Sequence, residues 1–435
     1  MGKITLKEVS VLITKGTTPS SIGCQFVEKG INFIKSESIS DSKYLNNQIY
    51  EHIDEKTDCK LKRSRLQEGD LLFSIAGAYL GKIAIVRNID IPANTNQAVG
   101  IVRLNKYKVD VGYIYYYFSQ NHINKYINML SSQSSQPNLN LELLGKLKFE
   151  MKDIFDQQKI ASVLSSLDSK IELNNQINLE LEAMAKTLYD YWFVQFDFPD
   201  KNGKPYKTSG GKMIWNIQLK REIPEGWING SFSDLGNIIG GSTPSKDVAE
   251  YFNCNGTAWI TPKDLSMNNG NKFITKGELD VSEKGIKAAS LKIMPKGTIL
   301  LSSRAPIGYM AIARESLTTN QGFKSFVPKN GYSTPFIYYA IKNTLPEIVN
   351  NASGSTFKEI SGGTLKVIKI CLPKIDVIEN YTKKVAAIFE MQSNLELENQ
   401  KLSELRDWLL PMLMNGQVKI SEKTSYNTKA VSTNF

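Results

Sequence analysis

A heptad pattern of apolar residues over residues 156–193 is the feature that most constrains how this chain can fold. No Gly or Pro interrupts the stretch, and apolar residues recur at alternating spacings of four and three, as on a helix that packs along one face. At about 1.5 Å per residue this helix would be roughly 55 Å long. A stripe of that length needs a partner helix in water. The stripe consists of Ile160, Leu164, Leu167, Ile171, Asn174, Asn178, Leu181, Ala185, Leu188 and Trp192.

A second stripe near the C-terminal end supplies the partner. It consists of Val385, Ile388, Gln392, Leu395, Asn399, Leu402, Leu405, Leu409 and Met412. The segments 173–176 and 397–400 have nearly the same sequence, and both place amide side chains in the seam. Whether Asn174 or Asn175 faces the seam stays open. We predict an antiparallel two-helix coiled coil, in which the amides fix the register. The alternative is two amphipathic helices that pack on separate cores.

An ordered internal repeat is the second strong signal. Six short segments recur in the same order at an offset of about 225 residues. They are Gly16-Thr17-Thr18-Pro19 with Gly241-Ser242-Thr243-Pro244, 32–35 with 258–261, 69–74 with 297–302, 81–85 with 308–312, Asn96-Gln97 with Asn320-Gln321, and Tyr115-Tyr116 with Tyr338-Tyr339. Each half then ends in one of the long helices. The chain is therefore predicted to be a globular unit, a helix, a second globular unit and a second helix.

Each globular unit is predicted to mix helices and strands. Short apolar runs bounded by Gly, Pro and Asn predict strands at 70–75, 82–87, 298–302 and 310–314. Helices are predicted at 111–130 and 335–349, and loops at 131–140 and 350–358. The fold class is α+β, with a pseudo-two-fold internal repeat. The predicted domains are 1–150, 151–196 (central helix), 197–224 (junction), 225–373, 374–416 (C-terminal helix) and 417–435 (a polar tail expected to be disordered).

Composition points to a polyanionic partner and a reducing compartment. The formal charge is +10 and the isoelectric point is near 9.1, which favours nucleic acid. The four cysteines lie far apart without a CxxC pair, so we expect free thiols rather than disulfides or a zinc site. No signal-peptide segment or membrane-length apolar run is present. We expect a cytoplasmic protein without a membrane span.

Motifs for catalysis are missing. The two histidines, His52 and His122, have no partner at metal-ligand spacing. There is no phosphate-binding loop, and residues 210–213 lack its first glycine and its hydroxyl. No Gly-rich turn follows a strand as a dinucleotide or S-adenosylmethionine site requires. We therefore predict a chain that is not an enzyme, with no catalytic residue, metal or cofactor of its own.

Taken together, these motifs resemble the specificity subunit of type I restriction–modification systems. The resemblance rests on two units that each precede a long helix, on the Gly-Thr-Thr-Pro and Gly-Ser-Thr-Pro segments, and on Gly-Asp-Leu-Leu-Phe-Ser at 69–74. The segments 192–211 and 223–227 are similar to the central junction of that family. The similarity covers about residues 5–416.

The resemblance implies a function and a set of partners. Each globular unit would be a target recognition domain that reads one half of a bipartite, asymmetric site in double-stranded DNA. The helix pair would set the spacer between the half-sites and dock two methyltransferase subunits, which methylate adenine at N6. Restriction subunits would join that complex. S-adenosylmethionine, ATP and Mg²⁺ would be bound by these partners and not by this chain.

Base reading requires side chains with donors and acceptors on loops of a rigid body. The candidate DNA-binding residues are Thr17, Thr18, Lys35, Ser36, Lys82, Gln133, Ser134, Gln136, Ser242, Thr243, Lys246, Lys263, Arg304, Ser355, Thr356 and Lys358. The lysines suit phosphate contacts, and the serines and threonines are equally suited to turns and caps. A buried, loop-bracing role is favoured for the recurring residues Asn96, Gln97, Asn320 and Gln321.

Two aromatic groups each have two interpretations. Residues 113–118 could stack on bases, but core packing on a helix is favoured. The second group lies toward the ends of the long helices and could serve partner subunits or pack on the adjacent unit. It consists of Tyr189, Tyr191, Trp192, Phe193 and Trp408.

The duplicated architecture also predicts geometry. Two similar units on antiparallel helices would be related by an approximate two-fold axis and could face one side of a duplex, about 34 Å or ~10 bp apart. The rival interpretations are a DNA-binding architectural or anti-restriction module without a methyltransferase partner, an enzyme with an unrecognised site, and a scaffold for proteins alone.

Overall fold

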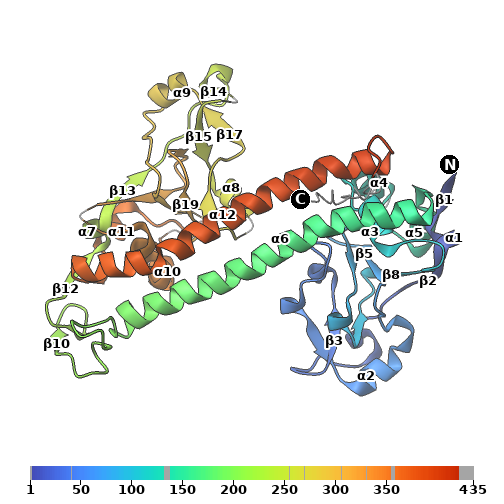
Figure 1. Cartoon of the computed structure of the whole chain (residues 1–435), viewed down its shortest axis with the longest axis horizontal. Coiled ribbons are helices and arrows are strands. Elements are labelled where there is room, and N and C mark those ends of the chain that lie inside the picture. Colours follow the sequence, from blue (N-terminus) through green and yellow to red (C-terminus); the bar gives the residue numbers. More distant parts are fainter. Residues whose placement is uncertain are drawn as a thin grey trace, which may run out of the picture. The chain divides into compact units, whose positions relative to one another are not determined.

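The computed structural model describes residues 2–420 except 41, 132–137, 254, 269, 305, 330 and 354–357. Mixed α/β regions and two long helices make up this part of the chain (Figure 1). None of the helices in these ranges combines the length and the apolar character needed to cross a membrane. The predicted disordered tail falls almost entirely on residues 421–435, which lie outside the described residues.

The first α/β region is built on two sheets. One has the strand order β2-β8-β5-β6, the other has the order β4-β3-β7, and β1 pairs with β9. The strands are β1 (Lys3–Thr5), β2 (Ser10–Lys15), β3 (Ile31–Ile34), β4 (Glu51–Ile53), β5 (Leu71–Ser74), β6 (Ile83–Ile85), β7 (Ala93–Thr95), β8 (Val99–Leu104) and β9 (Lys148–Glu150).

The second region repeats this plan. One sheet has the order β13-β21-β18-β19-β16, another has the order β14-β17-β15-β20, and β12 pairs with β22. The strands, with the β10–β11 hairpin of the junction, are β10 (Met213–Asn216), β11 (Arg221–Pro224), β12 (Ile228–Ser231), β13 (Gly236–Gly240), β14 (Phe252–Asn253), β15 (Thr257–Ile260), β16 (Phe273–Ile274), β17 (Leu279–Val281), β18 (Ile299–Leu301), β19 (Met310–Ala313), β20 (Thr318–Thr319), β21 (Lys324–Pro328) and β22 (Lys369–Leu372).

Strand pairing matches between the regions in direction as well as in order. β5 pairs antiparallel with β6, and β18 pairs antiparallel with β19. The parallel pairs β3–β7 and β15–β20 also correspond. The α+β class and the internal repeat are confirmed, as are the four strands predicted from apolar runs.

Both faces of the central strands are buried, because side chains alternate along a strand. Leu71 and Phe73 of β5 belong to one core cluster, and Leu72 belongs to another on the opposite face. In β18, Ile299 and Leu301 likewise face one cluster and Leu300 faces another. Continuous apolar runs, rather than alternating ones, are therefore what these strands require.

The two long helices are the predicted ones. α6 spans Ile154–Tyr189 and continues as the π-helical turn η6 (Asp190–Val194), and α12 spans Ile375–Met414. The shorter helices are α1 (Leu6–Val9), α2 (Glu55–Lys60), α3 (Val111–Phe118), α4 (Asn121–Ser131), α5 (Leu141–Lys146), α7 (Phe232–Leu235), α8 (Pro262–Met267), α9 (Glu283–Ala288), α10 (Thr334–Asn350) and α11 (Gly362–Val367).

The helix predicted at 111–130 is wrong as a single element, because it breaks between α3 and α4. The Ser119 hydroxyl donates to the carbonyl of Tyr116 at 3.2 Å, and the Gln120 amide donates to that of Tyr117 at 3.0 Å. Side chains thus take over carbonyls that the next helical turn would otherwise use. The counterpart α10 runs unbroken, as predicted.

The apolar stripe of α12 departs from prediction toward its C-terminal end. Leu410 and Leu413 are buried, whereas Leu405 is 43% exposed and Leu409 is only half-buried. A straight α-helix drifts by about 20° per heptad relative to a strict seven-residue repeat. Over several heptads this drift moves the inward face by about one residue, which is the observed shift.

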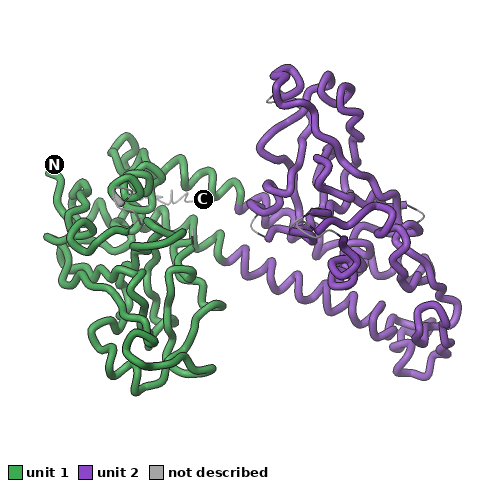
Figure 2. The backbone as a smooth tube through the Cα atoms, turned by 180° about the vertical axis from the view of Figure 1, so that it is seen from behind, with its two compact units in different colours: residues 1–172, 400–435 green, residues 173–399 purple. Residues whose placement is uncertain are grey.

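Two compact units emerge from the contacts within the chain. Unit 1 contains Met1–Glu172 and Gln400–Phe435, and unit 2 contains Leu173–Asn399 (Figure 2). Each unit therefore holds one α/β region together with a segment of α6 and a segment of α12. The domain boundaries proposed from the sequence stay predictions.

Candidate nucleic-acid interface

The repeated Gly-Thr/Ser-Thr-Pro segment forms the same braced loop in both units. In unit 1, the side-chain oxygen of Gln97 accepts hydrogen bonds from the hydroxyl of Thr18 and from its backbone amide, the latter at 3.1 Å. In unit 2, the Thr243 hydroxyl donates to Gln321 in the same way. Gln97 and Gln321 are exposed, so the sequence prediction that they are buried is wrong. Their contacts nevertheless brace the loops.

Each loop needs its glycine because another backbone segment passes close by. A Cβ at Gly16 would lie 1.9 Å from the carbonyl oxygen of Thr95, and one at Gly241 would lie 2.1 Å from that of Asn320. The next residue then donates its amide to the crossing strand, from Thr17 to Thr95 at 3.1 Å in unit 1. Asn96 and Asn320 fold back on their own chain, accepting amides two residues on at 3.1 Å and 2.9 Å. These contacts fix the path of the loop backbone in both units.

The other unit 1 candidates differ in accessibility. Ser36 is 8% exposed, so its side chain is not available to a duplex in this structure. The prediction that Ser36 binds DNA is therefore wrong. Lys35 is half-buried and forms an ion pair with Glu51 at 2.5 Å, which neutralises its charge. Lys82 lies over the ring of Tyr79 at 5.4 Å. Gln133, Ser134 and Gln136 lie outside the described residues.

Arg63 is a candidate that the sequence reasoning missed. It is exposed, and its guanidinium donates to the carbonyl of Lys15 and to the hydroxyl of Thr17, both at 3.4 Å. It therefore sits on the braced loop of unit 1. The signal was present in the sequence, since residues 60–65 contain four basic residues. An arginine here has donors suited to guanine or phosphate.

In unit 2, basic candidates gather around Glu359. Arg304 is exposed and pairs with Glu359 at 3.1 Å, Lys324 approaches the same carboxylate at 3.9 Å, and Lys358 precedes it in the chain. Ser242 is half-buried, Thr243 and Lys246 are exposed, and Lys263 pairs with Glu278 at 2.7 Å on the surface. Ser355 and Thr356 lie outside the described residues.

The helix pair has a mostly apolar seam with polar contacts at defined positions. Ile160, Leu164 and Asn174 are buried, and the other predicted seam residues are half-buried. These are Leu167, Ile171, Leu181, Leu188, Leu395, Asn399, Leu402 and Leu409.

Within unit 2, the seam amides of the two helices bond to one another. The amide of Asn174 donates to Asn399 at 2.9 Å, and that of Asn399 donates to Asn175 at 2.8 Å. Asn174 is fully buried and Asn175 is exposed, so Asn174 is the seam residue. In unit 1, Asp168 of α6 pairs with Arg406 of α12 at 2.9 Å. Within unit 2, Gln392 also donates to the carbonyl of Asn178 at 3.3 Å, so the segments of α6 and α12 in this unit run antiparallel.

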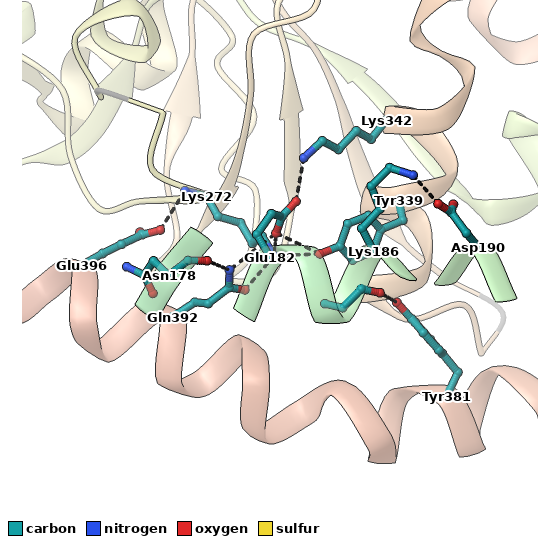
Figure 3. Close-up of polar contacts among 11 residues, drawn as sticks. Asn178, Glu182, Lys186, Asp190, Lys272, Tyr339, Lys342, Tyr381, Gln392 and Glu396 are labelled. Carbon is teal, nitrogen blue, oxygen red and sulfur yellow. Dashed lines mark hydrogen bonds and ion pairs between the residues drawn. The ribbon is translucent and has the colours of Figure 1, made fainter. Parts of the chain in front are cut away.

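A buried polar network joins the α/β region of unit 2 to its helix segments (Figure 3). The Lys272 ammonium lies 2.5 Å from Glu182 on α6 and 2.7 Å from Gln392 on α12. Glu182 also pairs with Lys342 at 2.6 Å and accepts the Tyr339 hydroxyl at 2.9 Å. One carboxylate thus collects three donors from the α/β region.

The charges in this network shift each other's ionisation. Burial acts to raise the pKa of Glu182, but Lys272 and Lys342 outweigh it and lower that pKa to about 2. Burial lowers the pKa of Lys272, against the attraction of Glu182. Burial raises the pKa of Glu396, although backbone amides and Arg314 oppose the shift.

The depressed pKa of Glu182 predicts a pH-dependent contribution to stability. Its folded pKa of about 2 lies below the ordinary glutamate value of 4.5, so its contribution is present above pH 4.5 and is lost as the pH falls toward 2. We expect Glu182→Gln to cost about 3 kcal/mol near pH 6 and nearly nothing near pH 2. Urea unfolding at a series of pH values measures this difference. The exposed pair offers a control, because Glu278→Gln should cost under about 0.5 kcal/mol at every pH. A pH-independent cost at Glu182 would contradict the linkage.

The aromatic groups divide clearly between core and surface. Within residues 113–118, every side chain is buried except that of Tyr117, which is half-buried, so core packing is correct for that cluster. At the end of α6, the residues Tyr189, Trp192 and Phe193 pack into the core of unit 2. Tyr191 is 36% exposed and Trp408 is 54% exposed, so these two stay accessible.

Comparison with known proteins agrees with this geometry. The family model for the type I restriction modification DNA specificity domain matches residues 1–183 and 224–407. The chain is 26% identical over 437 residues to the HindI specificity subunit of Haemophilus influenzae, covering 89% of this chain and 94% of that protein. It is 40% identical over 200 residues to the MjaIX specificity subunit of Methanocaldococcus jannaschii, covering 45% of this chain and 46% of that protein, which is less than half its length.

A solved structure shares the fold. The specificity subunit of a type I restriction–modification system from M. genitalium superimposes with a TM-score of 0.58 at 14% identity, covering 97% of this chain and 96% of that one. The match of the family model to most of this chain, in two segments that follow the internal repeat, shows the family. This chain therefore belongs to the type I restriction–modification DNA specificity family, and it is a non-catalytic subunit for DNA sequence recognition.

Proposed function

We propose that each α/β region reads one half of a bipartite, asymmetric DNA site, and that the helix pair sets the unread spacer between the halves. The observation that carries this proposal is the loop braced by the same threonine–glutamine contact in both units. A shared frame supports two equivalent reading surfaces, and the residues that differ around it, such as Arg63 and Arg304, allow the surfaces to prefer different bases.

The helix pair would also dock two methyltransferase subunits, through which restriction subunits join. The outer faces of α6 and α12 carry exposed apolar side chains that suit such an interface. They are Leu173, Leu179, Met184, Met391 and Trp408. In this proposal the partners bind S-adenosylmethionine, ATP and Mg²⁺, the modified base is adenine at N6, and the complex works in the cytoplasm.

Exchanging one α/β region tests the reading function. Replacing residues 5–150 by the corresponding region of another family member should change one half-site completely and leave the other half-site and the spacer unchanged. The reason is that the braced loop and its basic neighbours all lie within the exchanged region. Sequencing of N6-methyladenine in the DNA of cells that carry the exchanged chain and its partners measures the result.

A point variant controls for nonspecific effects of the exchange. Tyr107 is 97% exposed in the same region, so Tyr107→Ser should preserve both half-sites. A change in both half-sites after the exchange would contradict independent reading by the two regions.

A further inference from the structure

Among the described residues, each unit buries one lysine, and the two lysines occupy the same place in the fold. The carbonyl of Lys43 accepts the amide of Ile85 at 3.0 Å, and the carbonyl of Lys272 accepts that of Ile312 at 2.8 Å. The two lysines are 7% and 5% exposed. A lysine is seldom buried unless its charge is paired, so a repeated buried lysine calls for a reason within each unit.

In unit 2 this lysine holds both helices at once. Its ammonium contacts Glu182 of α6 and Gln392 of α12, and it lies 4.1 Å from the centre of the Phe389 ring. The Tyr339 hydroxyl lies 3.0 Å away. Figure 3 shows the Lys272 side chain directed toward Glu182 on α6 and Gln392 on α12. A single ammonium thus ties the α/β region to the helix pair.

A second buried charge fixes the same junction from the side of α12. Glu396 is 7% exposed and accepts the backbone amides of Lys272 and Phe273 at 2.8 Å and 3.1 Å. It also pairs with Arg314 at 2.6 Å. Rotation of the α/β region on the helices would leave these buried charges unpaired, which is strongly unfavourable.

The corresponding junction of unit 1 uses different partners. Lys43 donates to Ser165 of α6 at 2.6 Å, and Tyr116 donates to Asp168. The counterpart of Arg314 is Arg87, which pairs with Asp90 of its own region at 3.4 Å. Both junctions contain the buried lysine, but the acidic residues of the long helices that contact the α/β region differ between the two units.

We propose that Lys272, together with Glu182 and Glu396, is a positioning residue that fixes the angle at which unit 2 presents its reading loops. The connection is direct, because Lys272 immediately precedes β16 (Phe273–Ile274), β16 pairs with β19, and β19 pairs with β18. Arg304 lies three residues after the end of β18. This inference rests on the proposed function, since the angle matters only if the loops read a half-site at a set distance.

The test compares two matched double variants in the full chain with its methyltransferase partner. The junction variant is Lys272→Met with Glu182→Gln, which neutralises the buried pair. The control is Lys284→Met with Glu250→Gln, an exposed pair in the same unit with side chains 72% and 70% exposed. Selection from DNA with randomised half-sites and spacers of several lengths is measured for each.

We expect the junction variant to accept at least two spacer lengths where the native chain accepts one, and to bind the best site about 10-fold more weakly. The base preferences of both half-sites should persist, and the control should match the native chain. A single unchanged spacer length in the junction variant would overturn the proposal. So would loss of base preference in one half-site, because that result assigns these residues to reading.

A second measurement does not depend on DNA. The Phe273 amide, which donates to Glu396, should exchange its hydrogen at least about 10-fold faster in the junction variant than in the control. Equal exchange rates in the two variants would overturn the proposal of a fixed junction, whatever DNA the native chain selects. Failure of the native chain to select a two-part site would instead refute the proposed function. If the double variant does not fold, the single variant Glu182→Asp replaces it. This variant should accept a wider range of spacer lengths than the native chain, but a narrower range than that expected of the double variant. An unchanged range of spacer lengths would overturn the proposal.

Discussion

Deleting one heptad from each long helix is expected to shorten the preferred spacer by about three base pairs and to weaken binding to the original site by at least ~1,000-fold. Seven residues of α-helix rise about 10.5 Å, close to three steps of B-DNA at about 3.4 Å each. The expected loss is large because only one half-site at a time can then be contacted at the original spacing.

The contacts within each unit define where to make the deletion. Removing residues 169–175 and 399–405 keeps the Asp168–Arg406 ion pair and the hydrogen bond from Gln392 to the Asn178 carbonyl. A heptad deletion also preserves the phase of the apolar stripe. Selection of DNA with variable spacers measures the new preference.

A deletion that breaks the phase is the matched control. Removing five residues from each helix rotates the following segment by about 140°, so it should abolish specific binding at every spacer length. The ruler hypothesis is wrong if the heptad deletion alters the bases of either half-site while the spacer stays the same.

Replacing Phe193 with alanine is expected to lower the free energy of unfolding of unit 2 by about 3–5 kcal/mol. The ring is 5% exposed and lies 4.8 Å from Phe336 and 5.0 Å from both Tyr381 and Tyr189, measured between ring centres. Its removal deletes a shared partner of α6, α10 and α12 and leaves a cavity that these rings cannot readily fill.

Urea unfolding followed by tryptophan fluorescence measures this effect in unit 2. Trp192, Trp215, Trp227 and Trp259 all belong to that unit. Phe155 is 69% exposed near the start of α6, so Phe155→Ala should change stability by under about 0.5 kcal/mol. If Phe193→Ala lowered the free energy of unfolding by less than about 1 kcal/mol and weakened partner binding, Phe193 would be an interface residue and not a core residue.

The sequence was sufficient for the architecture because its signals are local and repeated. Heptad spacing reports helix pairing directly, and the duplicated segments expose equivalent strands even where a single run is ambiguous. The helix break after Phe118 was missed because it depends on the side chains of Ser119 and Gln120 turning to nearby carbonyls, a choice that periodicity does not record.

The junction network could not be predicted from the sequence. Lys272 stands in a polar, Asn-rich segment, where a lysine is normally exposed. Its partners Glu182 and Gln392 lie about 90 and 120 residues away in the chain. The two acids of the network, Glu182 and Glu396, lie on helices rich in charged residues. Periodicity alone could therefore not predict that their side chains are buried. The candidate reading residues were equally uncertain, because Ser36 and Arg304 both fit a basic or polar loop but differ in exposure.

The braced loops have a consequence for how such chains change over generations. Because Gln97 holds Thr18 and Gln321 holds Thr243 through atoms unrelated to base choice, mutation of neighbouring side chains leaves the path of the backbone intact. New base preferences can therefore arise one substitution at a time, without an intermediate in which the loop is unfolded. Under the proposed function, the same independence lets one region diverge while its duplicate keeps its old target.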